Sequence, residues 1–242
     1  MGNGRFPHLQ KTNHVVVSIM WLLKEKPTWK NPFYTPKEEI ANSVTHAIGV
    51  GLSIAGLTAL VILAAIYGDI WRIVSFSIYG SSLILLYLAS TLYHSLQQPR
   101  IKQILRKFDH ASIYILIAGT YTPYLLVSLR GSVGWTYFAL VWGMAAAGIV
   151  WKMFFLGKLE VVATIMYILM GWMCVFAFKH MIAALPPLGL IMLVTGGVIY
   201  TLGVIFYAWE KLPYNHAIWH LFVLGGSICH FISIATLIPV QS

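Results

Sequence analysis

Residues 44–67 read VTHAIGVGLSIAGLTALVILAAIY, a mostly apolar run that contains no Asp, Glu, Lys or Arg. A helix needs roughly 20 such residues to cross a hydrocarbon core about 30 Å thick, so this stretch predicts a transmembrane helix. Other runs of similar length and composition follow, and together they predict an all-α membrane protein built as a seven-helix bundle. The seven expected spans are residues 44–67, 72–94, 110–129, 134–152, 161–179, 187–208 and 216–238.

The composition of the whole chain agrees with a membrane location. Hydrophobic residues make up 59% of the sequence and charged residues 10%, against about 25% charged residues in soluble domains. The connections between the expected spans are mostly short. We therefore expect one compact domain over residues 44–242, in the cell membrane and with no separate soluble domain.

The basic residues predict which way the bundle is inserted. If the N-terminus is cytoplasmic, the three basic residues of the outer segments are Arg72, Arg130 and Lys179. Such an excess on the inner side is typical of cytoplasmic loops, so we expect the N-terminus inside and the C-terminus outside. Topology then explains the net charge of +9 without a nucleic-acid partner. The thirteen basic residues of the inner segments are Arg5, Lys11, Lys24, Lys26, Lys30, Lys37, Arg100, Lys102, Arg106, Lys107, Lys152, Lys158 and Lys211.

The first 43 residues form a separate segment that we expect to be cytoplasmic. Its apolar stretch, residues 15–23, is too short to span a bilayer and lacks the layout of a signal peptide. We interpret it as an interfacial helix on the inner leaflet. Pro27, Pro32 and Pro36 interrupt helical continuity between it and the first span.

Histidines occur at two short spacings in this apolar chain. The first is Ser90-x-x-x-His94, and the second is His216-x-x-x-His220. Residues four apart share one face of a helix, so His216 and His220 point the same way. Three imidazoles with one open position make a catalytic type of zinc site. Ionisable residues inside membrane spans usually belong to a functional site. These three histidines therefore predict a metal site inside the membrane.

The expected topology places the polar residues on one side of the bilayer. Ser90 and His94 end the second span, Asp109 precedes the third, and His216 and His220 open the seventh. All five therefore fall at similar depth near the cytoplasmic face, whereas opposite faces would separate them by about 30 Å. Further polar residues that enter the first span from the same side are Glu39, Asn42, Thr45 and His46.

The order of these motifs resembles the haemolysin III family. The motifs are Glu39-x-x-Asn42-x-x-Thr45-His46, Ser90-Thr-Leu-Tyr-His94, Asp109-His110, Ala118-Gly-Thr-Tyr-Thr-Pro123, and His216-x-x-x-His220 with His230 beyond it. This family is grouped with the progestin and adipoQ receptors, the adiponectin receptors and the alkaline ceramidases, in a superfamily of proposed membrane hydrolases. The resemblance covers the chain from about residue 35 onward.

The resemblance implies one zinc ion near the cytoplasmic face. His94, His216 and His220 would be its ligands, Asp109 would contact the water held there, and Ser90 would lie beside it. The chemistry of these residue types agrees, since zinc lowers the pKa of water towards about 7 and a carboxylate can take its proton. A serine hydroxyl can stabilise an oxyanion or orient a ligand ring.

Several of these residues also have a structural interpretation. Asp109 is suited to cap the third helix, and Ser90 to bond a carbonyl one turn earlier. His110 is turned about 100° from Asp109, which favours a packing role. His46 is a candidate for outer support of the site, and His230 is expected to be a buried, hydrogen-bonded histidine.

Three functions are compatible with this sequence. The first is a zinc-dependent hydrolase of membrane lipid amides or esters, which needs an open metal position and an apolar tunnel. The second is a sensor or regulator in which zinc only ties the second, third and seventh spans together. The third is a pore-forming haemolysin, which needs a polar stripe through several spans. No nucleotide-binding motif occurs, and Cys174 and Cys229 indicate no disulfide framework.

Overall fold

A computed structural model of the chain describes residues 34–155 and 160–239. These ranges are helical and contain no strand, which confirms the all-α prediction. The expected interfacial helix at residues 15–23 lies outside the described residues. The elements are α2 (Pro36–Tyr67), α3 (Ile70–Ser95), α4 (Pro99–Pro123), the π-helical turn η1 (Tyr124–Ser128), α5 (Ser132–Phe155), α6 (Glu160–Gly171), the 3₁₀ turn η2 (Trp172–Val175), α7 (Phe178–Ala184), α8 (Pro187–Ala208) and α9 (Asn215–Ala235).

The helices have the lengths that membrane crossing requires. Among the described residues, six helices are long and apolar enough to span a bilayer, and α6 to α7 make a seventh if that bent pair counts as one span. The chain is therefore a multi-pass membrane protein. The inside-outside orientation of its termini stays a prediction.

The fifth expected span, residues 161–179, is wrong as a continuous helix. Helix α6 ends at Gly171, and the path turns by 54° before α7. The cause is a side chain from α4 that enters the helical hydrogen-bond ladder. The Tyr121 hydroxyl donates to the Gly171 carbonyl at 2.5 Å and accepts the Cys174 N–H at 2.9 Å.

Two helices begin earlier than hydropathy predicts. Helix α2 starts at Pro36 instead of residue 44, because Thr35 and Glu38 form a reciprocal capping box. Helix α4 starts at Pro99 instead of residue 110, with Gln98 at its N-cap position. Its first turns are basic, and a hydropathy criterion excludes them although they are helical.

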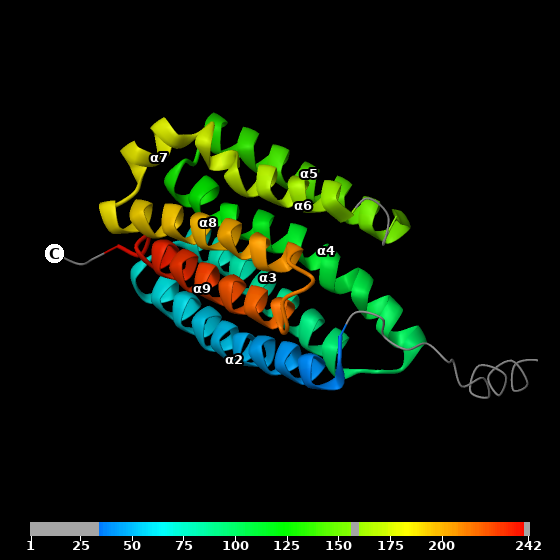
Figure 1. The fold of residues 1–242 in the computed structure, drawn as a ribbon. Helices are drawn as coiled ribbons and strands as arrows, with labels where there is room; N and C mark the ends of the chain where they lie inside the picture. Colours follow the sequence, from blue (N-terminus) through cyan, green and yellow to red (C-terminus); the bar gives the residue numbers. More distant parts are fainter. Residues whose placement is uncertain (1–33, 156–159, 240–242) are drawn as a thin grey trace, which may run out of the picture. The chain divides into compact units, whose positions relative to one another are not determined.

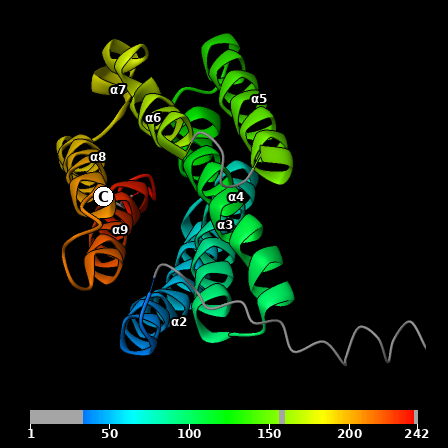
Figure 2. The same cartoon turned by 45° about the vertical axis from the view of Figure 1, so that its right-hand side comes forward.

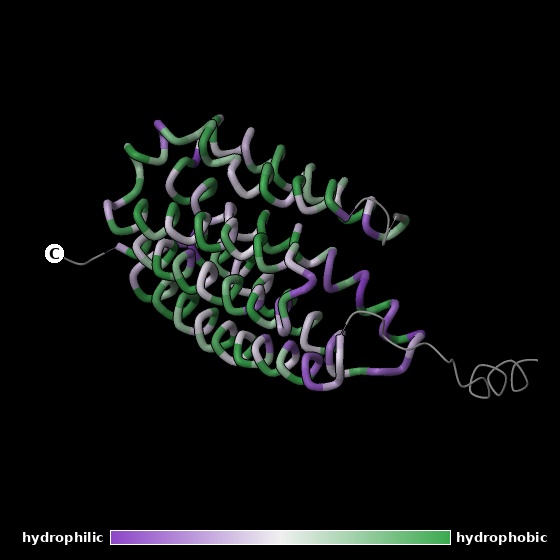
Figure 3. The backbone as a smooth tube through the Cα atoms, viewed as in Figure 1, coloured by the Kyte–Doolittle hydropathy of each residue, from purple (hydrophilic) through white to green (hydrophobic). Residues whose placement is uncertain are grey.

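Helices that are consecutive in the sequence pack on each other, and α9 returns to lie against α2. Helices α8 and α9 lie side by side in both ribbon views (Figures 1 and 2). Hydrophilic residues gather at the end of the bundle where α2 and α4 begin, and apolar residues dominate the helices beyond it (Figure 3). The polar end holds the candidate site.

Close packing between α2 and α3 depends on Gly49. A Cβ atom built there would lie 2.5 Å from the Tyr87 ring. Tyr87 is buried, and its hydroxyl donates to Ser227 Oγ of α9 at 2.7 Å, so the ring has no simple way to move aside. This contact joins α2, α3 and α9, the three helices that carry the histidine cluster and its neighbours.

The packing predicts that Gly49→Ala destabilises the protein by about 1–3 kcal/mol, the usual cost of overpacking a core. Gly51→Ala is the matched control, since a Cβ there meets nothing within 4 Å. It should leave stability unchanged or raise it by up to about 1 kcal/mol. Thermal unfolding of both variants in detergent tests this; equal stabilities would contradict the packing argument.

Candidate metal centre

Three histidines from two helices meet at the polar end of the bundle. His94 lies in the last turn of α3, and His216 and His220 lie in the first turns of α9. One ring nitrogen of each histidine lies within 4.8 Å of one ring nitrogen of each of the other two. The prediction that both histidine groups share one depth is therefore confirmed, and the cluster could hold a metal ion.

The start of α9 is fixed by a contact with α2. Tyr214, just before Asn215, has a left-handed backbone with φ of 58°. Its N–H donates to Glu38 Oε1 at 3.1 Å. Glu38, the second member of the α2 capping box, therefore also holds the start of α9, the helix that carries His216 and His220.

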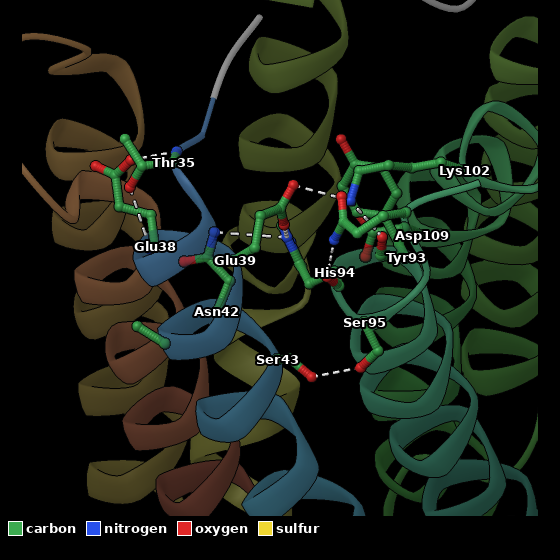
Figure 4. A network of polar contacts seen from close by, with 12 residues as sticks. Thr35, Glu38, Glu39, Asn42, Ser43, Tyr93, His94, Ser95, Lys102 and Asp109 are labelled. Carbon is green, nitrogen blue, oxygen red and sulfur yellow. Dashed lines mark hydrogen bonds and ion pairs between the residues drawn. The ribbon is translucent and has the colours of Figure 1, made fainter. Parts of the chain in front are cut away.

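Hydrogen bonds define which nitrogen two of the histidines can offer to a metal. His94 Nδ1 lies 2.6 Å from Glu39 Oε2, and His220 Nδ1 lies 3.0 Å from the Asn42 carbonyl oxygen (His94, Glu39 and Asn42 are drawn in Figure 4). Carboxylate and carbonyl oxygens only accept, so each Nδ1 carries the proton. The Nε2 lone pairs of His94 and His220 are then available for a metal.

Several buried nitrogens of this cluster have no hydrogen-bond partner among the described residues: Nε2 of His94 and both ring nitrogens of His216. All three histidines are buried, with at most 7% of any one exposed. Buried polar atoms without partners are rare and need an explanation, such as a bound ion. A divalent ion would bind Nε2 of His94 and one ring nitrogen of His216, so the residues fit the metal that the resemblance implies.

Asp109 and Ser90 line the same cavity as His216 and His220. The capping interpretation of Asp109 is wrong, because the residue lies inside α4, well past the N-cap at Gln98. The back-bonding interpretation of Ser90 is also wrong: within the described ranges its buried Oγ has no hydrogen-bond partner. Both residues thus belong to the wall of the cavity that His216 and His220 also line.

His46, Glu39 and Asn42 come from α2 and surround the cluster. The His46 ring stacks on His220 with 3.5 Å between centroids, which supports its expected outer role. Glu39 and Asn42 contact His94 and His220 and do not cap α2, whose cap is Thr35.

His110 and His230 lie apart from the histidine cluster. His110 Nδ1 lies 3.4 Å from Asp109 Oδ2, and its carbonyl accepts the Tyr167 hydroxyl. His230 Nε2 donates to the Leu193 carbonyl at 3.1 Å, which confirms the predicted hydrogen bond, but the residue is half-buried instead of buried. Neither histidine belongs to the group of possible metal ligands found in the described residues.

Sequence reasoning missed two residues of this region, Tyr34 and Lys102. The Tyr34 ring lies 4.9 Å from the His216 ring and 5.7 Å from the His94 ring, measured between centroids. Desolvation raises the pKa of the Tyr34 hydroxyl well above its ordinary value, so the side chain stays a neutral phenol. Lys102 is fully buried although it counts as a loop charge in the sequence. No spacing in the sequence distinguishes either residue.

A cavity leads away from the histidine cluster between the helices. Near the cluster its wall includes His46, Ser90 and Asp109, and its far end reaches His230. From His216 to His230 the lining follows α9 for about 20 Å, at 1.5 Å per residue. Apolar and aromatic side chains from α3, α4, α6, α8 and α9 form most of the wall.

The fold and the site define a multi-pass helical membrane protein with a buried three-histidine cluster beside an aspartate and a serine. Residues 34–231 match the family described as haemolysin-III related. The chain belongs to this haemolysin III family, which confirms the resemblance seen in its motifs.

Similar proteins come from bacteria and mammals. The chain is 52% identical to a hemolysin-3 homolog of Bacillus subtilis, over 82% of its own length and 93% of the relative. It is 48% identical to hemolysin-3 of Bacillus cereus, over 86% and 94%. A human protein named monocyte to macrophage differentiation factor is 31% identical, over 81% and 83%.

The cluster predicts that the purified protein carries one divalent transition metal ion per chain, measured by elemental analysis. The double variant His216→Ala/His220→Ala should lose this ion because a single imidazole remains. His230→Ala is the control and should keep the ion, since His230 lies outside the cluster. Equal metal content in the wild type and the double variant would rule out the site.

Proposed function

We propose that this protein is a zinc-dependent hydrolase of membrane lipid amides or esters. The observation that carries the proposal is the cavity, which joins His216 and His220 of the cluster to an apolar passage about 20 Å long. A metal that only ties helices together needs no such passage. A lipid hydrolase needs both the passage and polar groups at its end.

The dimensions of the cavity suit a lipid chain. Half of a hydrocarbon core about 30 Å thick is roughly 15 Å, so the passage is at least as long as one leaflet is deep. Ile117 of α4, Ile168 of α6 and Val204 of α8 give it an apolar wall. A lipid that enters laterally from the bilayer would place its chain there and its amide or ester near Ser90 and Asp109.

Zinc is the metal that the donor set favours. Three neutral imidazoles are ligands typical of zinc, and a site with three protein ligands leaves one position open. His94, His216 and His220 would hold the ion. When bound, zinc would supply a Lewis acid that polarises a carbonyl and makes water more acidic.

Asp109 and Ser90 would carry out the proton transfer and the stabilisation of the developing negative charge. The Asp109 carboxylate would take a proton from the attacking water and pass it to the leaving amine or alcohol. The Ser90 hydroxyl, which has no partner among the described residues, would donate to the carbonyl oxygen as negative charge develops there. Water adds across the C–N or C–O bond, which yields a carboxylic acid and the freed amine or alcohol.

The proposed location of this chemistry follows from the predicted topology. With the N-terminus inside, the site lies near the cytoplasmic face of the cell membrane, and the products form there. The basic segments on that side would attract anionic lipid headgroups.

The names of the Bacillus relatives raise a second possibility, a pore that lyses cells. An aqueous pore needs a polar wall, whereas the lining of the described cavity is mostly apolar. We therefore rank the pore below the hydrolase. A sensor that keeps zinc without turnover remains the main alternative, and the experiment below separates the two.

Asp109→Asn should reduce lipid hydrolysis about 10²–10⁴-fold because the amide cannot accept the proton. Zinc content should stay at one ion per chain, since Asp109 is not a ligand. A panel of ceramides and phospholipids in detergent provides the assay, with the exposed Glu210→Gln as the control that keeps activity. Zinc in the wild type without turnover of any lipid would favour the sensor.

Gly197→Leu should shift activity towards lipids with shorter chains, because Gly197 lines the passage on α8. A Cβ there meets only Trp172, at an ordinary distance of 3.6 Å, so the helix accepts a side chain. We expect a raised KM for long-chain substrates with zinc retained. Gly143→Leu on α5 is the control, because a Cβ there meets nothing within 4 Å. Unchanged chain-length preference would contradict the passage.

A further inference from the structure

A buried ion pair lies against Nδ1 of His94. Glu39 of α2 and Lys102 of α4 form it, with 2.8 Å between Glu39 Oε1 and Lys102 Nζ. We infer that this pair is a positioning device, which holds His94 ready to bind the metal. The inference rests on the metal-binding part of the proposed function and not on hydrolysis.

The two oxygens of Glu39 have different partners. Oε2 accepts from His94 Nδ1 at 2.6 Å, while Oε1 faces Lys102 (Figure 4). A carboxylate held at both oxygens cannot rotate freely about its last bond. The His94 ring is therefore fixed in the tautomer and the orientation that leave Nε2 free for the metal.

Lys102 is itself held in place. Its Nζ donates to the Tyr93 carbonyl at 2.8 Å, and the ammonium lies 4.7 Å from the centroid of the Tyr93 ring. Tyr93 precedes His94 in the last turn of α3, where carbonyls lack intrahelical partners. Lys102 thus ties the end of α3 to α4 and holds Glu39 at the same time.

Charge explains why both members are needed. Glu39 is 4% exposed and Lys102 is fully buried, and a single buried charge is costly unless it is paired. Together they are neutral, so Glu39 can accept from His94 without adding net charge to the site. Carboxylate partners of metal-binding histidines make the ligand more basic, and their loss usually weakens metal binding about 10- to 100-fold.

The burial of Lys102 indicates that this lysine does more than set the orientation of the protein in the membrane. A basic residue that only sets orientation can stay in the headgroup region. Lys107, on the same helix, is partly exposed, whereas Lys102 is enclosed and bonded to groups on two other helices. This contrast makes Lys107→Met a matched control for Lys102→Met.

The test uses the full-length protein in detergent and measures three properties of each variant. Zinc affinity is measured by competition with a chelator, thermal stability on the metal-free protein, and ligand geometry from the visible spectrum of the cobalt form. The variants are Glu39→Gln, Lys102→Met and the double variant Glu39→Gln/Lys102→Met, with Lys107→Met as control.

We expect Glu39→Gln to weaken zinc binding about 10- to 100-fold and to alter the cobalt spectrum. Lys102→Met should also weaken it, because Glu39 loses its second partner. Each single variant removes one charge of the buried ion pair and should be less stable without metal. The double variant removes both charges, so its metal-free stability should return towards that of the wild type while its zinc affinity stays low. Lys107→Met should match the wild type throughout.

The double variant separates positioning from general folding. Zinc affinity and a cobalt spectrum equal to those of the wild type in Glu39→Gln and in the double variant would overturn the inference and leave the proposed hydrolase intact. A folded wild type that binds no zinc would overturn both. Bound zinc without lipid turnover would overturn the hydrolase alone.

Discussion

The structure depends on a constraint of the membrane interior, where a polar atom cannot find water and needs a partner from the protein or a ligand. The histidine cluster meets this constraint in two ways. The Nδ1 atoms have protein partners: His94 Nδ1 donates to Glu39, and His220 Nδ1 donates to the Asn42 carbonyl. His94 Nε2 and both nitrogens of His216 lack such partners among the described residues, and a metal ion would bind His94 Nε2 and one of the His216 nitrogens.

Helix α2 is long enough to cross the bilayer, and it also holds the histidine cluster in place. Its capping box ends beside the residues that contact the cluster, and Glu38 also bonds the start of α9. Further along, Gly49 lets Tyr87 of α3 approach, and the Tyr87 hydroxyl reaches Ser227 of α9. The same helix therefore contacts both the histidine cluster and the packed ring of Tyr87.

Much of this could be predicted from the sequence, because apolar runs and four-residue spacings are local patterns. Such patterns predicted the helices and the joint placement of His94, His216 and His220. The break after Gly171 could not be predicted, because its cause is Tyr121, a residue 50 positions away. The burial of Lys102 could not be predicted for a similar reason, because only tertiary contacts distinguish a buried lysine from a lysine in a loop.

The bend after α6 also affects how this part of the chain can cross the bilayer. Helix α6 has 12 residues and rises about 18 Å, while α2 has 32 and rises about 48 Å. The hydrocarbon core is about 30 Å thick, so α6 alone is too short for it and α2 is longer than it needs. A crossing at this place therefore needs η2 and α7 as well as α6. The bend then lies within the span, where Tyr121 bonds the Gly171 carbonyl and the Cys174 N–H, backbone groups that a continuous helix would pair with its own backbone.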